Sequence, residues 1–494
     1  MIRPVLLVVI PLLLGFLSVM FKKQAKPMLI VAALLNVVMV FVIEKGMYYL
    51  GNHKPPYGIV LNIDSYSLYA LVVLNLVFTA LILLNLVKVE RIASILLITL
   101  AGLNGMLMTG DLFNLFVFME ISAIAAFMIV TTNKKLVHVF NYMIIAIVGS
   151  SMYLFGVILL YSQYGTLNMD KLASLMGENT PGTYIPIIMI FAGLAVETKL
   201  LPFNGWVKGI LANSDSFVGP MIGSIYSGVF LIVFGRLFTD VFVLSPQVKL
   251  LLSVVAIVTI IAGEFAAFSS LKLRQILLYS SIAQSGLAVV LFINGYGSVA
   301  ILVVFANVVA KLVLFTLAGI MANSHMETEH TAFENIYNNK TGNLDDVEAL
   351  SGIFLKNPLN GIAFTVSALS LGSLPFFFGF FVKINVLYSM FNNGDYVLPA
   401  IILVASLIEG AYIIRMLVKL WNPGKEGEKA TKEAVTPLNY EINQLICMAI
   451  LLISLSLLVL GVSPDLAISR ADEAGMDLEY NISTEYVELE GGMK

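Results

Sequence analysis

The chain has 494 residues, of which 59% are hydrophobic and only 12% are charged, and its formal net charge is −3. Soluble domains average roughly 45–50% apolar and about 25% charged residues, so this composition excludes a soluble enzyme, a disordered chain, a collagen and a nucleic-acid-binding protein. A mean hydropathy of +0.93 leaves a membrane protein that crosses the bilayer many times.

A helix that crosses a bilayer needs about 20 mostly apolar residues. The sequence contains fourteen such stretches, most of them uncharged and none with the alternating pattern of a transmembrane β-strand. They lie near residues 4–21, 27–43, 65–87, 92–109, 112–130, 140–161, 184–206, 218–235, 248–268, 275–293, 298–320, 357–391, 397–418 and 441–462. The first follows Arg3 as a signal peptide would, but lysines come directly after it and no small-residue cleavage site precedes them, so we expect a retained helix.

Basic residues are distributed unevenly between the loops that join these spans. Most Lys and Arg lie in the odd-numbered loops, among them the lysines of 22–26 and the basic residues of 415–432. Because positive charge is enriched on the cytoplasmic side of membrane proteins, we predict that these loops face the cytoplasm and that both termini face outward. The loop 322–351 and the tail 463–494 are acidic, and we expect them to be solvated or to face a partner.

The seventh and twelfth spans carry the same interruption. Residues 201–208 and 374–383 both read Leu-Pro-Phe, a short gap, Gly, aromatic, Val and Lys. A proline inside a helix removes a backbone hydrogen bond and clashes with the preceding turn, so both helices are predicted to break, at Pro202 and at Pro375. The motifs are five spans apart, and this odd number inverts the second copy. Paired interruptions in inverted repeats indicate a transporter's ion path; the alternative is that each proline is only a packing kink.

Seven charged residues lie deep within the predicted spans, where each costs about 2.5–3.5 kcal/mol on insertion scales. Such groups can pass protons through water and through polar side chains between them. The main candidates for a proton path are Glu120, Lys199, Lys311 and Lys383. Possible further members are Glu197, Glu264 and Glu409. The alternative for each is a structural ion pair or a side chain that reaches toward the interface, and for Glu409 it is local pairing with Tyr412 or Arg415.

The sequence contains few residues suited to catalysis or to metal binding. One cysteine, Cys447, and four histidines give no convincing nucleophile, metal site or cofactor site. We therefore expect no catalytic residue, no metal and no cofactor in this chain, and we expect any redox chemistry to take place in another polypeptide.

Several motifs along residues 90–465 resemble one family. They include Asn114 to Glu120, Phe140 to Gly156, Pro202 to Trp206, Tyr279 to Gly286, and Ala368 to Lys383, the last being the strongest match. The chain resembles the antiporter-like subunits of the complex I superfamily. These are the L, M and N subunits of proton-pumping NADH:quinone oxidoreductase, the A and D subunits of Mrp-type sodium/proton antiporters, and the large antiporter-like subunits of membrane-bound hydrogenases and sulfane reductases.

The resemblance implies an all-helical fold of about fourteen transmembrane helices, with helices 7 and 12 discontinuous. Helices 1–3 would occupy residues 1–90, and the two inverted five-helix repeats would be helices 4–8 (91–237) and helices 9–13 (248–420). Helix 14 and the acidic tail would occupy 421–494. By position, Glu120 matches the family's helix-5 glutamate, Lys311 its helix-11 lysine and Lys383 its helix-12 lysine, all along a hydrated central chain of charges.

The chain departs from the family pattern at three places. The family's helix-7 lysine lies five residues before the proline, where this chain has Glu197, and its own lysine, Lys199, comes two residues later. Two residues turn a helix by about 200°, so Lys199 replaces the usual group only if the break allows it. The helix-8 lysine is missing from residues 224–229, and the helix-11 histidine is Asn307, a possible member of the path. The first repeat is therefore altered.

The resemblance implies a proton- or Na⁺/H⁺-translocating subunit of a redox-driven pump linked to hydrogenase, ferredoxin or NADH, in the inner or plasma membrane of a prokaryotic cell. Its partners would be other membrane subunits, lipid and a soluble redox arm, and it would not bind nucleic acid. All redox centres would lie in the partner subunits. Residues 406–415 favour the hydrogenase-type and ferredoxin-linked branch. Alternatives are the D subunit of an Mrp-type antiporter, a scaffold with a defective first half-channel, and a standalone transporter of an organic substrate.

Overall fold

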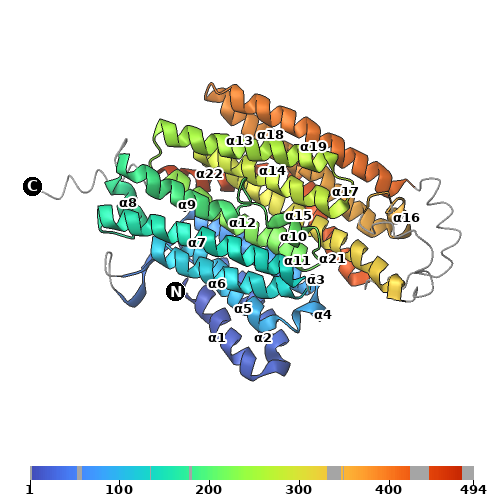
Figure 1. Cartoon of the computed structure of the whole chain (residues 1–494). Coiled ribbons are helices and arrows are strands. Elements are labelled where there is room, and N and C mark those ends of the chain that lie inside the picture. The colour runs from blue at the N-terminus through green and yellow to red at the C-terminus, as the bar shows by residue number, and fades with distance from the viewer. Residues whose placement is uncertain are drawn as a thin grey trace, which may run out of the picture.

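The computed structural model describes residues 3–52, 58–133, 135–176, 181–330, 346–348, 350–422 and 444–480. Long helices that run in roughly one direction make up most of the molecule (Figure 1). In the described ranges, ten helices are long and apolar enough to cross a membrane, and four shorter ones, α1, α5, α9 and α17, are also apolar. The prediction of a helical protein that crosses the membrane many times is confirmed.

The N-terminal part contains four longer helices and one small feature that the sequence did not predict, an antiparallel hairpin in which Gly46 pairs with Ile63. Helix α1 packs against α5, and α2 packs against both α3 and α5. The elements are α1 (Leu6–Met20), α2 (Ala25–Val40), β1 (Gly46–Tyr49), β2 (Val60–Ile63), α3 (Ser65–Leu84), α4 (Leu86–Val89) and α5 (Ala93–Met108).

The next part contains the first proline break. Helix α9 ends at Glu197 and α10 begins at Val207, and the residues between them form turns. The eighth predicted span is a helix with two π-helical segments, and every residue of its most apolar stretch is buried. The elements are α6 (Leu112–Thr131), α7 (Leu136–Tyr164), α8 (Met169–Leu175), α9 (Tyr184–Glu197), α10 (Val207–Leu211), α11 (Val218–Pro220), η4 (Met221–Tyr226), α12 (Ser227–Gly235) and η5 (Arg236–Val241).

The following part contains the second break, between Leu371 and Phe378. Ser373 and Phe376 have positive φ values of 55° and 74°, which are unfavourable for residues with a side chain. A side chain at Gly379 would collide with the carbonyl of Ser370, so glycine is needed where the chain re-enters the helix. The elements are α13 (Pro246–Ser269), α14 (Leu273–Ile293), α15 (Gly297–His330), α16 (Ile353–Lys356), α17 (Pro358–Leu371), α18 (Phe378–Asn392) and α19 (Val397–Trp421).

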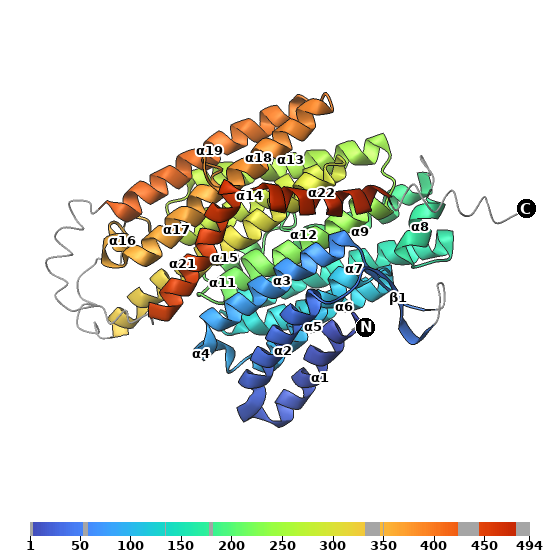
Figure 2. The same cartoon turned by 180° about the vertical axis from the view of Figure 1, so that it is seen from behind.

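The C-terminal helices correct one expectation. After α21 (Gln444–Val462), which packs on α17 and α18, the chain forms α22 (Asp465–Tyr480), which packs along α15 and α3 (Figure 2). The small residues Ala467, Ala471 and Ala474 are buried there. This part of the acidic tail is thus packed against the rest of the chain because its small residues allow close approach, whereas we expected it to be solvated or to face a partner. The tail after residue 480 lies outside the described residues.

In the acidic segment 322–351, residues 322–330 continue α15, whereas their side chains and residues 331–345 and 349 lie outside the described residues. Its end is held on the molecule by Glu348, which pairs with Lys419 of α19 at 2.6 Å and is 74% exposed. The hydrogen bond and the positive charge of Lys419 lower the pKa of Glu348.

A buried ion pair joins α3 to η5. The Arg236 guanidinium donates to both carboxylate oxygens of Asp64, at 2.8 and 2.6 Å, and to the hydroxyl of Ser67 at 3.0 Å. Asp64 also caps α3 by accepting from the backbone N–H of Ser67, and the Tyr66 ring lies 5.3 Å from the guanidinium carbon. Removing one member of a buried pair leaves the other charge without compensation, which makes such pairs costly to break.

We predict that Asp64→Ala lowers the free energy of unfolding by about 1–3 kcal/mol, because it removes two acceptors from the buried Arg236 guanidinium and a helix cap, while Asp240 remains near the guanidinium. The measurement is the thermal midpoint of the purified protein in detergent. Glu348→Ala, which breaks the exposed pair with Lys419, is the matched control and should leave the midpoint unchanged. Equal shifts for the two variants would contradict the prediction.

Candidate functional site

The seven deep charges divide into two groups inside the helical bundle. The first group comprises Glu120 on α6 and Glu197 at the end of α9, which interact electrostatically with each other. The second group contains the three lysines and the other two acids. Lys199 interacts with Lys311, and Lys311 interacts with Glu264 and Glu409. Each candidate thus has at least one other candidate as a neighbour, and we call the seven residues the central row.

Glu197 is held by aromatic residues around the first break. The hydroxyl of Tyr142 on α7 donates to Glu197 Oε2 at 3.0 Å, and the Tyr142 ring stacks on Trp206 at 4.1 Å between centroids. Trp206 Nε1 donates to the carbonyl of Val196 at 3.1 Å, which fastens the broken segment back onto α9. The carboxyl of Glu197 thus faces α6 and α7.

Lys199 is directed away from Glu197. Its φ of 65° takes the backbone out of the helix, and its side chain is completely buried. The ammonium donates to the hydroxyl of Ser281 on α14 at 2.5 Å and to the carbonyl of Gly223 in η4 at 3.4 Å. These two hydrogen bonds replace those that water would give the buried amine. The break therefore delivers the amine of Lys199 to the eighth span and toward Lys311.

Glu409 connects Lys383 to two amide side chains. Lys383 Nζ lies 3.1 Å from Glu409 Oε2, and only 1% of the Glu409 side chain is exposed. Gln284 on α14 donates to the other oxygen, Oε1, at 2.7 Å, and Asn307 on α15 donates to Gln284 Oε1 at 3.2 Å. Glu264 on α13 interacts electrostatically with Glu409, Lys383 and Lys311.

The alternative of local pairing on α19 is wrong for Arg415. Its guanidinium donates to the carbonyls of Phe268 and Ser270 at 2.6 and 3.2 Å and lies over the Phe268 ring. Arg415 therefore fastens α19 to the end of α13, and the cation that pairs with Glu409 is Lys383 from a different helix.

Four polar residues of this site were not among the predicted site residues. They are Tyr142, Tyr226, Ser281 and Gln284. Tyr226, whose hydroxyl donates to the carbonyl of Ser122 at 2.9 Å, interacts electrostatically with Glu197. Each is an uncharged polar residue within an apolar span, and that position is the sequence signal that could have found them.

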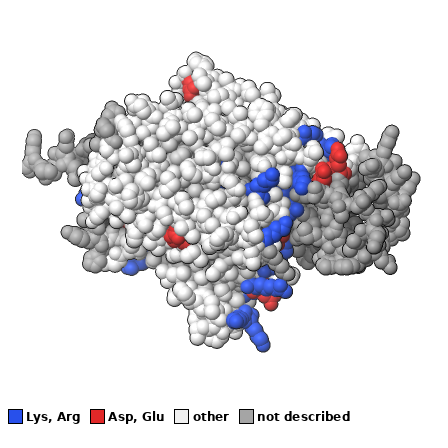
Figure 3. Space-filling model, in the orientation of Figure 1, with Lys and Arg blue, Asp and Glu red and all other residues white. Residues whose placement is uncertain are grey.

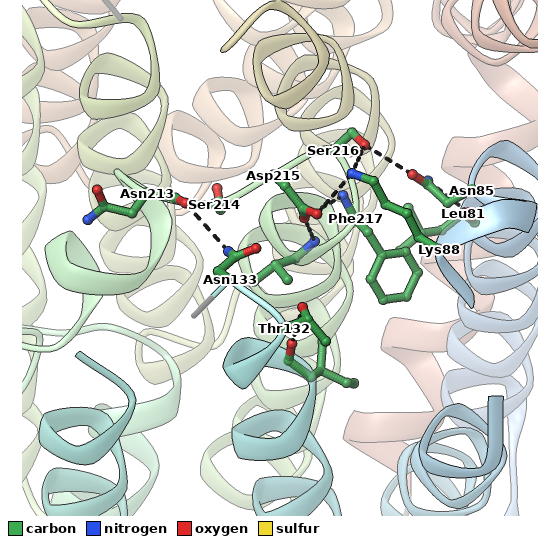
Figure 4. A network of polar contacts seen from close by, with 12 residues as sticks. Leu81, Asn85, Lys88, Thr132, Asn133, Asn213, Ser214, Asp215, Ser216 and Phe217 are labelled. Carbon is green, nitrogen blue, oxygen red and sulfur yellow. Dashed lines mark hydrogen bonds and ion pairs between the residues drawn. The ribbon is translucent and has the colours of Figure 1, made fainter. Parts of the chain in front are cut away.

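Lys88 of α4 binds the polar loop that contains Asp215 and Ser216 and follows the first break (Figure 4). Lys88 Nζ lies 2.9 Å from Asp215 Oδ2 and 2.8 Å from Ser216 Oγ, and Ser216 Oγ lies 3.1 Å from Asn85 Oδ1. A side chain at Gly319 of α15 would collide with the backbone of Asp215 and Ser216. The helix that carries Lys311 is thus in direct contact with the loop that follows the broken helix.

Among the described residues, no group of three or more His, Cys, Asp or Glu side chains could hold a metal ion. Two small cavities with mixed polar and apolar linings border the second group of charges instead. One, of about 30 Å³, is lined by Lys383, Ser370 and Ser373, and the other, of about 20 Å³, by Lys311 and Ser224.

Comparison with known proteins identifies the family. Residues 109–409 match the family described as the transmembrane part of NADH:quinone oxidoreductase and Mrp antiporters. This is more than half of the chain, and the chain therefore belongs to that family. The resemblance inferred from the sequence motifs is confirmed, and the protein is an antiporter-like membrane subunit.

Two curated relatives and one solved structure cover nearly the whole chain. The N subunit of the NADH-quinone oxidoreductase of Desulforudis audaxviator is 28% identical over 94% of this chain and 97% of its own length. The D subunit of the Na⁺/H⁺ antiporter of Alkalihalophilus pseudofirmus is 27% identical over 91% and 93%. A chain of the membrane-bound sulfane sulfur reductase, an archaeal respiratory membrane complex, is 26% identical with a TM-score of 0.84, covering 97% of this chain and 99% of that one.

We predict that Ser281→Ala destabilises the protein by about 1–3 kcal/mol, because it removes a hydroxyl that accepts from the buried Lys199 ammonium. The thermal midpoint in detergent measures the change. Ser285→Ala is the matched control, since Ser285, one turn further along α14, donates only to the carbonyl of Ser281. A control that loses as much stability as Ser281→Ala would refute the assigned contact.

Proposed function

We propose that this chain carries protons, or exchanges protons for sodium, as a subunit of a multisubunit redox-driven membrane pump. The observation that supports this most strongly is the row of buried acids and lysines, because ionisable groups inside a membrane are costly and are usually retained for transport. The proposed path runs from Glu120 to Glu197, and from Lys199 through Lys311 and Glu409 to Lys383.

The same proposal includes the finer architecture. The ten long and four shorter apolar helices would be fourteen spans, with 1–90 and 421–494 flanking inverted repeats at 91–237 and 248–420. In support, each of these two segments has its break in its fourth span, after Glu197 in one and after Leu371 in the other. A path at broken helices is favourable because freed backbone groups must face protein or water.

The altered first repeat is proposed to conduct rather than to serve as a scaffold. Glu197 occupies the usual lysine position and faces Glu120, while the Lys199 ammonium contacts the carbonyl of Gly223 in the eighth span, which has no lysine of its own. The break thus supplies an amine to the second group from the seventh span. This arrangement argues against the defective half-channel, because a lost function would not require a fully buried Lys199 next to Lys311.

The orientation and the partners follow from surface charge and from the relatives. Lys and Arg gather at one end of the visible face, where α4 and the end of α19 lie (Figure 3). We propose that this end faces the cytoplasm of a prokaryotic cell and that both termini lie outside. Other membrane subunits and a soluble redox arm that holds the redox centres would complete the pump. The second candidate is the D subunit of an Mrp-type antiporter, supported by the 27% identity to such a subunit.

We predict that Lys383→Ala or Glu120→Ala reduces proton translocation at least about tenfold in vesicles that contain the assembled complex, because each removes a charged step that the path requires. A pH-sensitive dye inside the vesicles reports the rate. Lys171→Ala, on the exposed surface of α8, is the control and should translocate normally.

Unchanged translocation in both path variants would refute the proposal and support a scaffold. Dependence of the flux on a sodium gradient, without any electron donor, would instead favour the Mrp-type candidate.

A further inference from the structure

The two small cavities near Lys311 and Lys383 share the same pair of amide side chains. Gln284 and Asn307 line both the cavity of about 30 Å³ beside Lys383 and the cavity of about 20 Å³ beside Lys311. We propose that the Gln284–Asn307 pair acts as a valve for protons: it separates two water sites on the path between these lysines, and neither amide can itself carry a proton. This inference rests on the proposed function.

Both cavities have the size and the chemistry that ordered water requires. A buried water needs about 10–15 Å³ and two to four polar partners, so each cavity has room for one or two molecules. The first cavity offers Ser370, Ser373 and Lys383 beside the amide pair. The second offers Ser224, Ser227, Ser285 and Lys311 beside the same pair. Water can therefore occupy both sides of the pair.

The hydrogen bonds of the pair run in one direction. Glu409 accepts from Gln284, and Gln284 accepts from Asn307. The second hydrogen of the Asn307 amide goes to the carbonyl of Val303 at 2.8 Å. The Asn307 oxygen, in contrast, is buried and receives no donor from the described residues. A buried acceptor without a partner costs about 1–3 kcal/mol, so this oxygen is positioned to accept from a water in one of the cavities.

A carboxamide neither gains nor loses a proton in the physiological range, in contrast to a histidine at the same place. Protons therefore cannot pass through Asn307 or Gln284 and must cross between the cavities by water when the pair turns aside. The pair is held by Glu409, and the other charges around it are Lys383 on α18, Lys311 on α15 and Glu264 on α13. The pair can turn aside only when the hydrogen bond from Gln284 to Glu409 breaks.

The test is the passive proton flux of the complete purified complex in liposomes, driven by a potassium diffusion potential, so that no electron donor is required. Asn307→Ala removes the barrier and joins the cavities, and we expect the flux to rise. Asn307→Leu fills the space with an apolar group of similar size that excludes water. We expect the flux to fall by about tenfold, which is the change in rate that the loss of one hydrogen bond produces.

The opposite signs of the two changes distinguish a valve from structural damage, which would shift both variants in the same direction. Asn75→Leu is the matched control, since Asn75 and Asn104 form another buried amide pair, at 2.8 Å, that lines neither cavity. The control should conduct as the parent does.

Two results would overturn the valve while leaving the proposed function in place. The first is an equal flux for both Asn307 variants and the parent, in a preparation where Lys383→Ala stops the flux. The second is a fall for both Asn307 variants that Asn75→Leu reproduces. If Lys383→Ala and Glu120→Ala both conduct as the parent does, the proposed function fails and the valve with it.

Discussion

The cost of placing charge in a medium of low polarity is the constraint on which the rest of this structure depends. A buried charge is tolerated only where an opposite charge or a set of hydrogen-bond donors and acceptors replaces water. Three charges of the central row meet this condition in different ways, whereas one oxygen of Glu264 is buried without a donor from the described residues. Lys383 has a carboxylate, Lys199 has a hydroxyl and a carbonyl, and Glu197 has a phenol. Because these partners come from different helices, the charges also determine how the helices are arranged.

The broken helices make these arrangements possible. A continuous helix would direct Glu197 and Lys199 to nearly opposite sides but would provide no free backbone carbonyls in the core. The break after Glu197 and the π-helical turns of η4 together expose the Gly223 carbonyl to the Lys199 amine. At the second break, Ser373 and Phe376 hold an unfavourable backbone conformation, which indicates that local strain is maintained by the packing of Gly379 against α17.

Much of the fold could be predicted from the sequence because the spans are long, apolar and separated by polar loops. Both interruptions were also predicted, because a proline acts on its own helix. The direction of Lys199 could not be predicted, since it depends on a single positive φ angle inside the break. The role of Gln284 depends on contacts between α14, α15 and α19, which are far apart in the chain. Helix α22 was missed because its buried face consists of alanines, which give almost no hydrophobic signal.

The helix formed by η4, α12 and η5 is enclosed on all sides, and it touches α5 and α9 in the first half as well as α14 and α15 in the second. Rocking of one half against the other, as in transporters that work by alternating access, would shear this helix from half of its neighbours and expose close-packed surface. Interiors packed at this density do not deform gradually. A large movement of one half against the other would therefore have to break the contacts of this helix on one side.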